Sequence, residues 1–236
     1  MALVRQQATI ARVGSGTSIN CSFAATPAIG SLIVVMATGW VSGTKAVTDN
    51  QAPANTYTLR TSSTRNGSPV NVGIWTAVAS AASGTFTVTA SGGYTTVVII
   101  EVRNQDGTTP VNDVSNTDSI GTSNAPVTAG LTSTVADCLV EGCMTEEPNN
   151  TMSTSAPWTQ GQEEEDNATY QEISEIYQVA GAAGAYNPLW ALSASANWVA
   201  SGIAIAPSAG APVVSIDMGT ALMPKNPARR PAVAAY

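Results

Sequence analysis

Short runs of β-branched or alternating residues, each closed by Gly, Pro, Asn or Ser, recur along most of this chain. Such spacing predicts antiparallel β-strands. Strands are expected at 4–13, 17–23, 31–40, 55–60, 70–78, 84–90, 94–103, 136–145, 169–180, 185–193 and 197–207. Between Gly84 and Ala90, Phe86, Val88 and Ala90 share one face and threonines the other, which predicts one wet side. The runs LIVVMA and TTVVIIEV are apolar on both faces, so they are expected at the centre of a sheet.

Two stretches rich in turn formers interrupt this pattern. Residues 104–135 are expected to be a surface excursion with one or two short strands, and 146–168 a second excursion. A single β-sandwich over 1–207 is therefore predicted, because all-β domains commonly reach this length. Residues 208–236 hold four prolines between Pro212 and Pro231, so they are expected to be extended. The alternatives are a disordered tail and an arm that packs on something else, and the many apolar residues favour the arm.

Composition narrows the class of protein. Charged residues make up 11% of the chain and histidine is absent. Without an imidazole, a Ser-His-Asp or Cys-His nucleophile is excluded. Paired carboxylates for glycoside hydrolysis remain an alternative, with candidates Glu101, Glu141, Glu146, Glu147 and 163–166. A run of acids is more often a solvated face, so we expect no enzyme. Three cysteines without CxxC spacing predict buried free thiols.

The charges are divided along the chain. Residues 104–224 contain no lysine or arginine but hold fourteen of the sixteen carboxylates, and Lys225, Arg229 and Arg230 follow. A net charge of −7 argues against nucleic-acid binding. No secretory signal is seen at the N-terminus and no apolar run is long enough to span a membrane, so we expect synthesis in the cytoplasm without export and no membrane partner.

Two further sites are suggested by residue type. Asp49 and Asn55 flank an early turn, where the alternatives are calcium ligation and side-chain bonds to the backbone of the turn. Trp158, beside the acidic run, is the aromatic expected to be exposed, either to stack on a glycan or to anchor an interface. Trp75, Trp190 and Trp198 lie within apolar strands and are expected in the core.

Several segments resemble a known β-sandwich module. SLIVVMATGW, VTDNQAPANTYTLR, VGIWTAV, GTFTVTA, TTVVIIEV and the distant AGAYNPLWALSASANWVASGIAIAP are similar to a jelly-roll or lectin-like module that recurs in phage structural proteins and bacterial surface proteins. The likeness covers residues 5–207 and rests on Val47, Thr48, Asp49, Asn55, Thr56, Tyr57 and Trp198. The inserted Ala52, Pro53 and Ala54 lengthen the turn. The resemblance implies an all-β, jelly-roll-like antiparallel sandwich and a virion location.

The hypothesis from sequence is thus a non-enzymatic phage virion protein, either a capsid decoration (cement) protein or a head or tail appendage. It is expected to form homo-oligomers and to bind other virion subunits of the capsid or tail. The interface is expected to join Lys225, Arg229, Arg230 and Tyr236 of the arm to Trp158 and to an acidic surface formed by Glu163, Glu164, Glu165 and Asp166. The alternative is a carbohydrate-binding module on a fibre or spike that recognises host glycans.

Overall fold

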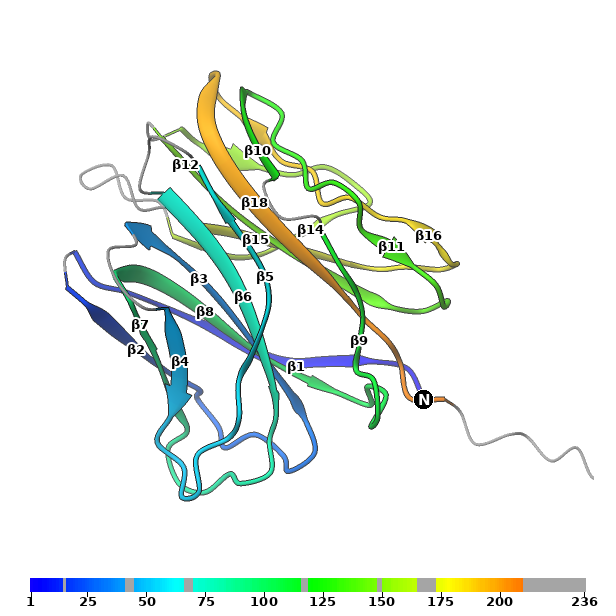
Figure 1. Cartoon of the computed structure of the whole chain (residues 1–236). Coiled ribbons are helices and arrows are strands. Elements are labelled where there is room, and N and C mark those ends of the chain that lie inside the picture. Colours follow the sequence, from blue (N-terminus) through cyan, green and yellow to red (C-terminus); the bar gives the residue numbers. More distant parts are fainter. Residues whose placement is uncertain are drawn as a thin grey trace, which may run out of the picture.

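The computed structural model describes residues 1–14, 16–40, 45–65, 70–115, 119–147, 150–164 and 173–209. This part of the chain is all-β, with antiparallel sheets packed in layers (Figure 1). It contains no helix that is long and apolar enough to span a membrane. The prediction of an antiparallel β-sandwich is confirmed. The expected arm, 208–236, lies outside the described residues from 210 onward.

The first half of the chain forms two layers. A five-stranded sheet has the order β1-β8-β3-β6-β5. A three-stranded sheet, β2-β7-β4, covers its outer face. The strands are β1 (Val4–Arg12), β2 (Ser18–Ser22), β3 (Leu32–Trp40), β4 (Ala46–Asp49), β5 (Thr58–Thr64), β6 (Val70–Val78), β7 (Thr87–Ser91) and β8 (Tyr94–Arg103).

The second half adds a six-stranded sheet in the order β10-β18-β12-β15-β14, with β9 also paired to β18. Two short ladders, β11-β16 and β13-β17, complete it. The strands are β9 (Val111–Val114), β10 (Ser119–Ser123), β11 (Thr132–Ser133), β12 (Leu139–Glu147), β13 (Met152–Ser153), β14 (Thr159–Glu164), β15 (Ile173–Val179), β16 (Gly184–Ala185), β17 (Ala191–Leu192) and β18 (Ala196–Ile205).

The two halves repeat one topology. In chain order, each strand pairing of the first half has a counterpart in the second: β1-β8 corresponds to β9 and β10 on β18, β3-β6 to β12-β15, β3-β8 to β12-β18, and β5-β6 to β14-β15. In the outer layer, β2-β7-β4 corresponds to β11-β16 and β17-β13. The order β1-β8-β3-β6 over β2-β7-β4 is that of a jelly roll, except that the fifth strand joins the larger sheet.

The sequence carries a trace of the same repeat. After β6 the chain reads VASAASGTF (78–86), and after β15 it reads VAGAAGAY (179–186). Ladder registers align the two segments, because Val78 pairs with Leu32 while Val179 pairs with Leu139. The two halves thus share one strand topology, and their two larger sheets pack face to face. A single β-sandwich domain over 1–207 was expected, and this domain division stays a prediction; the described sheets form two layered halves.

Three packed regions hold the layers together. Ile33, Val35 and Ile99 face the small sheet of the first half, while Val34, Val98 and Ile100 face the second half. The outer face of the six-stranded sheet packs beneath the short ladders and their loops, with Trp190 and Trp198 in its core. The central placement of β3 and β8 is confirmed, and so is the core position of Trp75, Trp190 and Trp198. Phe86, Val88 and Ala90 are fully buried as predicted.

The two expected excursions contain more strand than the sequence predicts. Residues 104–135 hold β9, β10 and β11, and 146–168 hold β13 and β14. The short strand β4 was also expected to be turn. These strands lie at sheet edges or in the outer layer, where few side chains are buried, so a clear period-two pattern is missing from their sequences.

Candidate functional site: a buried ionic cluster and a terminal surface

Two glutamates lie in the interface between the large sheets. Glu141 on β12 and Glu175 on β15 are both 0% exposed. Their registers place them where the first half has Val34 and Ile74, since Val34 lies two residues after Leu32 and Ile74 four before Val78. Two positions that hold buried aliphatic side chains in the first half therefore hold carboxyl groups in the second half. From the sequence, Glu141 was one of several candidates for a pair of catalytic carboxylates, and Glu175 was not among them.

Arg5 of β1 crosses from the first half to these acids. Its Nε donates to Glu141 Oε1 at 3.2 Å and its Nη2 to Glu175 Oε2 at 2.5 Å. The guanidinium also lies over the ring of Tyr177, 4.5 Å from the centroid. The backbone N–H of Gln162 on β14 donates to the same Glu175 oxygen at 2.8 Å. One cation that is 16% exposed thus serves two carboxyl groups that are fully buried.

This geometry makes the two acids unequal. Burial raises the pKa of Glu141 well above its usual value; the negative charge of Glu175 adds to this, and Arg5 opposes it. Glu175 accepts two charge-assisted bonds on Oε2, whereas Glu141 accepts one on Oε1. The raised pKa makes Glu141 the acid that retains a proton more readily, beside the negative charge of Glu175. A glycosidase needs its two acids on the wall of an open cleft, and this pair is enclosed by protein.

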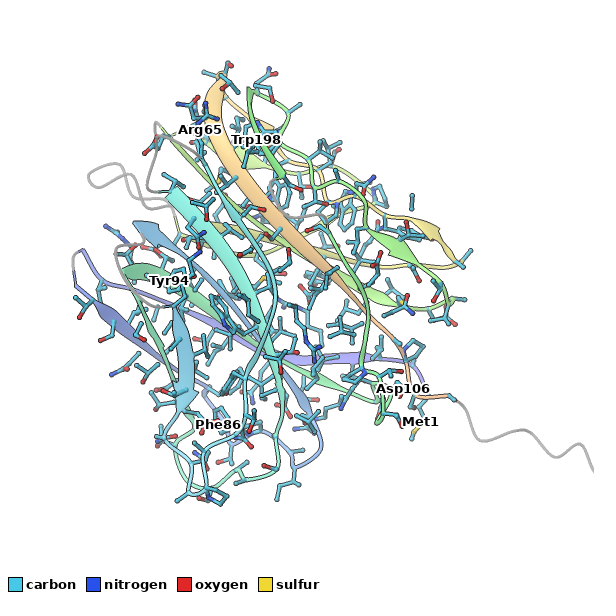
Figure 2. All side chains as sticks on the ribbon, in the orientation of Figure 1. Met1, Arg65, Phe86, Tyr94, Asp106 and Trp198 are labelled. Atoms are coloured by element: carbon cyan, nitrogen blue, oxygen red, sulfur yellow. The ribbon has the colours of Figure 1, made fainter. Side chains whose placement is uncertain are left out.

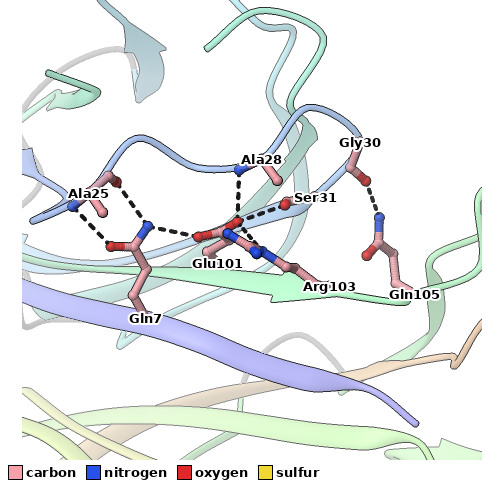
Figure 3. Close-up of polar contacts among 8 residues, drawn as sticks. All are labelled: Gln7, Ala25, Ala28, Gly30, Ser31, Glu101, Arg103 and Gln105. Carbon is pink, nitrogen blue, oxygen red and sulfur yellow. Dashed lines mark hydrogen bonds and ion pairs between the residues drawn. The ribbon is translucent and has the colours of Figure 1, made fainter. Parts of the chain in front are cut away.

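A second buried carboxylate, Glu101, braces one end of the first half (Figure 3). It is 0% exposed and accepts bonds from Arg103 Nε at 2.8 Å, Ala28 N at 2.9 Å, Ser31 Oγ at 2.8 Å and Gln7 Nε2 at 2.7 Å. Burial by itself would raise the pKa of Glu101, but these donors together lower it. The loop that precedes β3 is thereby fixed to β1 and β8.

The Asp49–Asn55 turn forms the side-chain bonds expected of a turn. Asp49 Oδ1 accepts the N–H groups of Gln51 and Asn55, and Oδ2 accepts Asn55 Nδ2 at 2.7 Å and the Tyr57 hydroxyl at 3.1 Å. Asn55 Oδ1 accepts the N–H groups of Ser80 and Ala81. The turn is held by protein donors. Among the described residues, no group of three or more His, Cys, Asp or Glu is placed to hold a metal, and calcium binding here stays an untested prediction.

The expected interface residues are only partly described. Glu163 and Glu164 lie on the edge strand β14, and Glu164 pairs with Arg12 of the same chain at 3.5 Å. The charge of this strand is thus partly balanced within the protein. Trp158 was expected to be exposed and is half-buried; it packs against the outer core that holds Trp190 and Trp198 and against a second group around Leu131. Glu165, Asp166, Lys225, Arg229, Arg230 and Tyr236 lie outside the described residues.

The start of the chain, the crossing between halves and the end of the described chain meet at one place. Asn104 Nδ2 donates to Ala2 O at 2.9 Å, and Ser208 N donates to Asn104 O at 2.7 Å. Gln105 and Pro207 form an isolated antiparallel β-bridge. Figure 1 shows the N-terminus beside the last described residues of the chain. Figure 2 places Met1 and Asp106 here, far from Arg65 and Trp198 at the opposite end.

Two adjoining clefts open at this place, and Met1 and Ser208 line both. The larger, of about 650 Å³, is also lined by Val135, Val179, Asp106, Asp137 and Ala209. The smaller includes Ile29 and Arg103, beside the Glu101 brace. We call Met1, Ile29, Asp106, Val135, Asp137 and Val179 the terminal surface. Among the described residues, the three most exposed large apolar side chains, Met1 (77%), Ile29 (71%) and Val179 (61%), all belong to it.

Comparison with known proteins adds no assignment: no protein-family model, no curated protein and no solved structure matches the chain. The terminal surface could not be found from the sequence because its residues come from five separate segments. Each is an ordinary valine, isoleucine, methionine or aspartate beside a turn, and only the strand pairing brings them together.

Proposed function

We propose that this protein is a non-enzymatic virion structural subunit: a decoration (cement) protein of a phage capsid, or part of a head or tail appendage. It joins the particle through residues 210–236. The virion setting is supported by the sequence resemblance to phage structural modules, and the means of attachment by the layout of the chain.

One observation carries the attachment. The described chain ends at Ala209 in the wall of the larger cleft, next to the most exposed apolar side chains of the described part. The residues that follow contain Lys225, Arg229 and Arg230 among prolines, valines, leucine and methionines. Apolar residues interspersed with cations, presented on a rigid base, suit attachment to an acidic and partly apolar surface. Repetition of weak contacts over a symmetric shell would make attachment firm.

The test compares the full chain with a chain ending at Ala209. Ending there keeps the Gln105–Pro207 bridge and the Ser208 N–H bond to Asn104. We expect the shortened protein to keep its circular dichroism spectrum and unfolding midpoint and to be lost from particles. As a matched control, Ile120→Asp on β10 alters an exposed apolar residue at the other end and should leave incorporation unchanged. Normal incorporation of the shortened chain would refute the proposal.

A further inference from the structure

The arm needs a receiving surface, and the acidic run of 163–166 was the one expected from sequence. Glu164 of that run is already paired with Arg12 of its own chain, so the charge available for a partner is smaller than the sequence implies. The terminal surface is the stronger candidate, because it combines exposed apolar side chains with acidic groups around one cleft.

We propose that the larger cleft of the terminal surface binds residues of the 210–236 segment of a second copy of this chain. This inference rests on the proposed function, since it names the site at which the attaching segment docks. Each copy then offers one segment and one cleft, an arrangement that yields a reciprocal pair or a closed ring.

The chemistry of the cleft matches the segment. Val135 and Val179 supply apolar wall, with 41% and 61% of their surfaces exposed. Asp106 and Asp137 supply negative charge on the same wall. Backbone N–H groups of Thr109 and Thr108 lower the pKa of Asp106, which keeps it charged at neutral pH. The sequence LMPKNPARRPAV (222–233) presents cations between apolar residues, as such a wall requires.

The volume of the cleft and the length of the 210–236 segment favour a neighbouring copy as the source of the residues that bind in the cleft. A cleft of about 650 Å³ takes a short run of chain and not the whole segment. Lys225 lies sixteen residues beyond Ala209, which at about 3.1 Å per residue for a proline-rich extended chain is a reach of roughly 50 Å. Prolines remove backbone donors and fix φ, so they disfavour a hairpin that would return the segment to its own cleft.

The walls of the cleft are rigid enough to act as a receptor. Asp106 is fixed by the N–H groups of Thr108 and Thr109 at 2.7 and 2.8 Å. The neighbouring 28–31 loop is held by Glu101 and by a bond from Gln105 Nε2 to Gly30 O (Figure 3). A preformed site loses little conformational entropy on binding.

The test uses the full chain in two tagged forms, one carrying a photoreactive phenylalanine analogue in place of Val179. After mixing and irradiation, we expect an inter-chain cross-link that mass spectrometry maps to 210–236. Val179→Asp should weaken self-association by about tenfold or more, as for loss of an interface anchor. Ile120→Asp should leave it unchanged. Arg229→Glu should weaken association, and adding Asp137→Arg should restore it in part.

Three results would overturn the inference: a full chain that stays monomeric at every concentration, cross-links confined within one chain, or self-association that Val179→Asp does not weaken. Failure of the inference is separable from failure of the proposed function. If the chain ending at Ala209 is lost from particles while Val179→Asp is incorporated normally, the segment docks elsewhere and the function stands. If the shortened chain is incorporated normally, the proposed function itself fails.

Discussion

The two buried glutamates should respond differently to the same substitution. Glu175→Gln removes the negative charge that accepts bonds from Arg5 and from Gln162 N, at 2.5 and 2.8 Å. The bond from Gln162 N becomes a neutral one and the bond from Arg5 keeps the charge of its donor only. At about 1 kcal/mol for each weakened bond, we expect a loss of about 2 kcal/mol in unfolding free energy. Removing one partner of a buried pair can cost more, about 3–5 kcal/mol, but here Glu141 remains and can ionise to pair with Arg5.

Glu141→Gln should be nearly neutral. A glutamine has the shape of a protonated glutamic acid; its amide can donate to Glu175, and its oxygen can accept from Arg5 Nε. We expect a change within about 1 kcal/mol near neutral pH. Glu164→Gln is the matched surface control, because its pair with Arg12 is 37% exposed on the glutamate side and should contribute no more than about 0.5 kcal/mol.

The pH dependence of the unfolding free energy gives a second, independent test of the protonation of Glu141. The pKa of Glu141 is raised in the folded protein, so between the unfolded and folded pKa values the native state holds more protons than the unfolded state. The contribution of Glu141 to stability is therefore full below the unfolded pKa and is lost as pH rises through the folded one, by up to about 1.4 kcal/mol per pH unit. Glu141→Gln removes this loss, so its stability relative to the native sequence should rise with pH.

Urea unfolding followed by tryptophan fluorescence between pH 5 and 8, run on all three variants, measures both effects. An equal or larger loss for Glu141→Gln than for Glu175→Gln would refute the assignment of the proton. A difference between Glu141→Gln and the native sequence that does not grow with pH would do the same.

Three further predictions concern the scaffold. Asn55→Ala should lower the free energy of unfolding, measured with urea, by about 3 kcal/mol, because the 5%-exposed amide joins Asp49 to Ser80 and Ala81. A loss as small as that of exposed Thr48→Ala would contradict this. Gly161→Ala should lower the unfolding midpoint, since a Cβ there would overlap the Glu175 carboxylate, whereas Gly181→Ala meets open space and should be tolerated. The buried cysteines, with the pKa of Cys21 raised to about 11 by burial, should react with a disulfide reagent at pH 8 only after unfolding; reaction in the native state would show that the cores open.

Sequence pattern was sufficient wherever a strand is buried on a defined face. The apolar runs of β3, β6, β8 and β18 and the alternation of β7 placed those strands to within a few residues. Ile173–Val179 was also expected as strand, and it is β15. The same reasoning gave buried cysteines and core tryptophans, because burial of such side chains depends on the local pattern more than on partner choice. The absence of histidine likewise argues against Ser-His-Asp and Cys-His catalysis from the sequence alone.

What tertiary structure decided is which residues meet. Nothing local to Arg5, Glu141 or Glu175 indicates that they form one buried cluster, because their sequence separations are 136 and 170 residues. The shared topology of the two halves was hidden for a related reason: the pairing order is the same in both, whereas Val34 and Ile74 of the first half correspond in register to Glu141 and Glu175 of the second. The terminal surface arises only because the chain's start, middle crossing and described end converge. Periodicity fixes how one strand sits in a sheet, whereas a site joined across sheets depends on the packing of the whole chain.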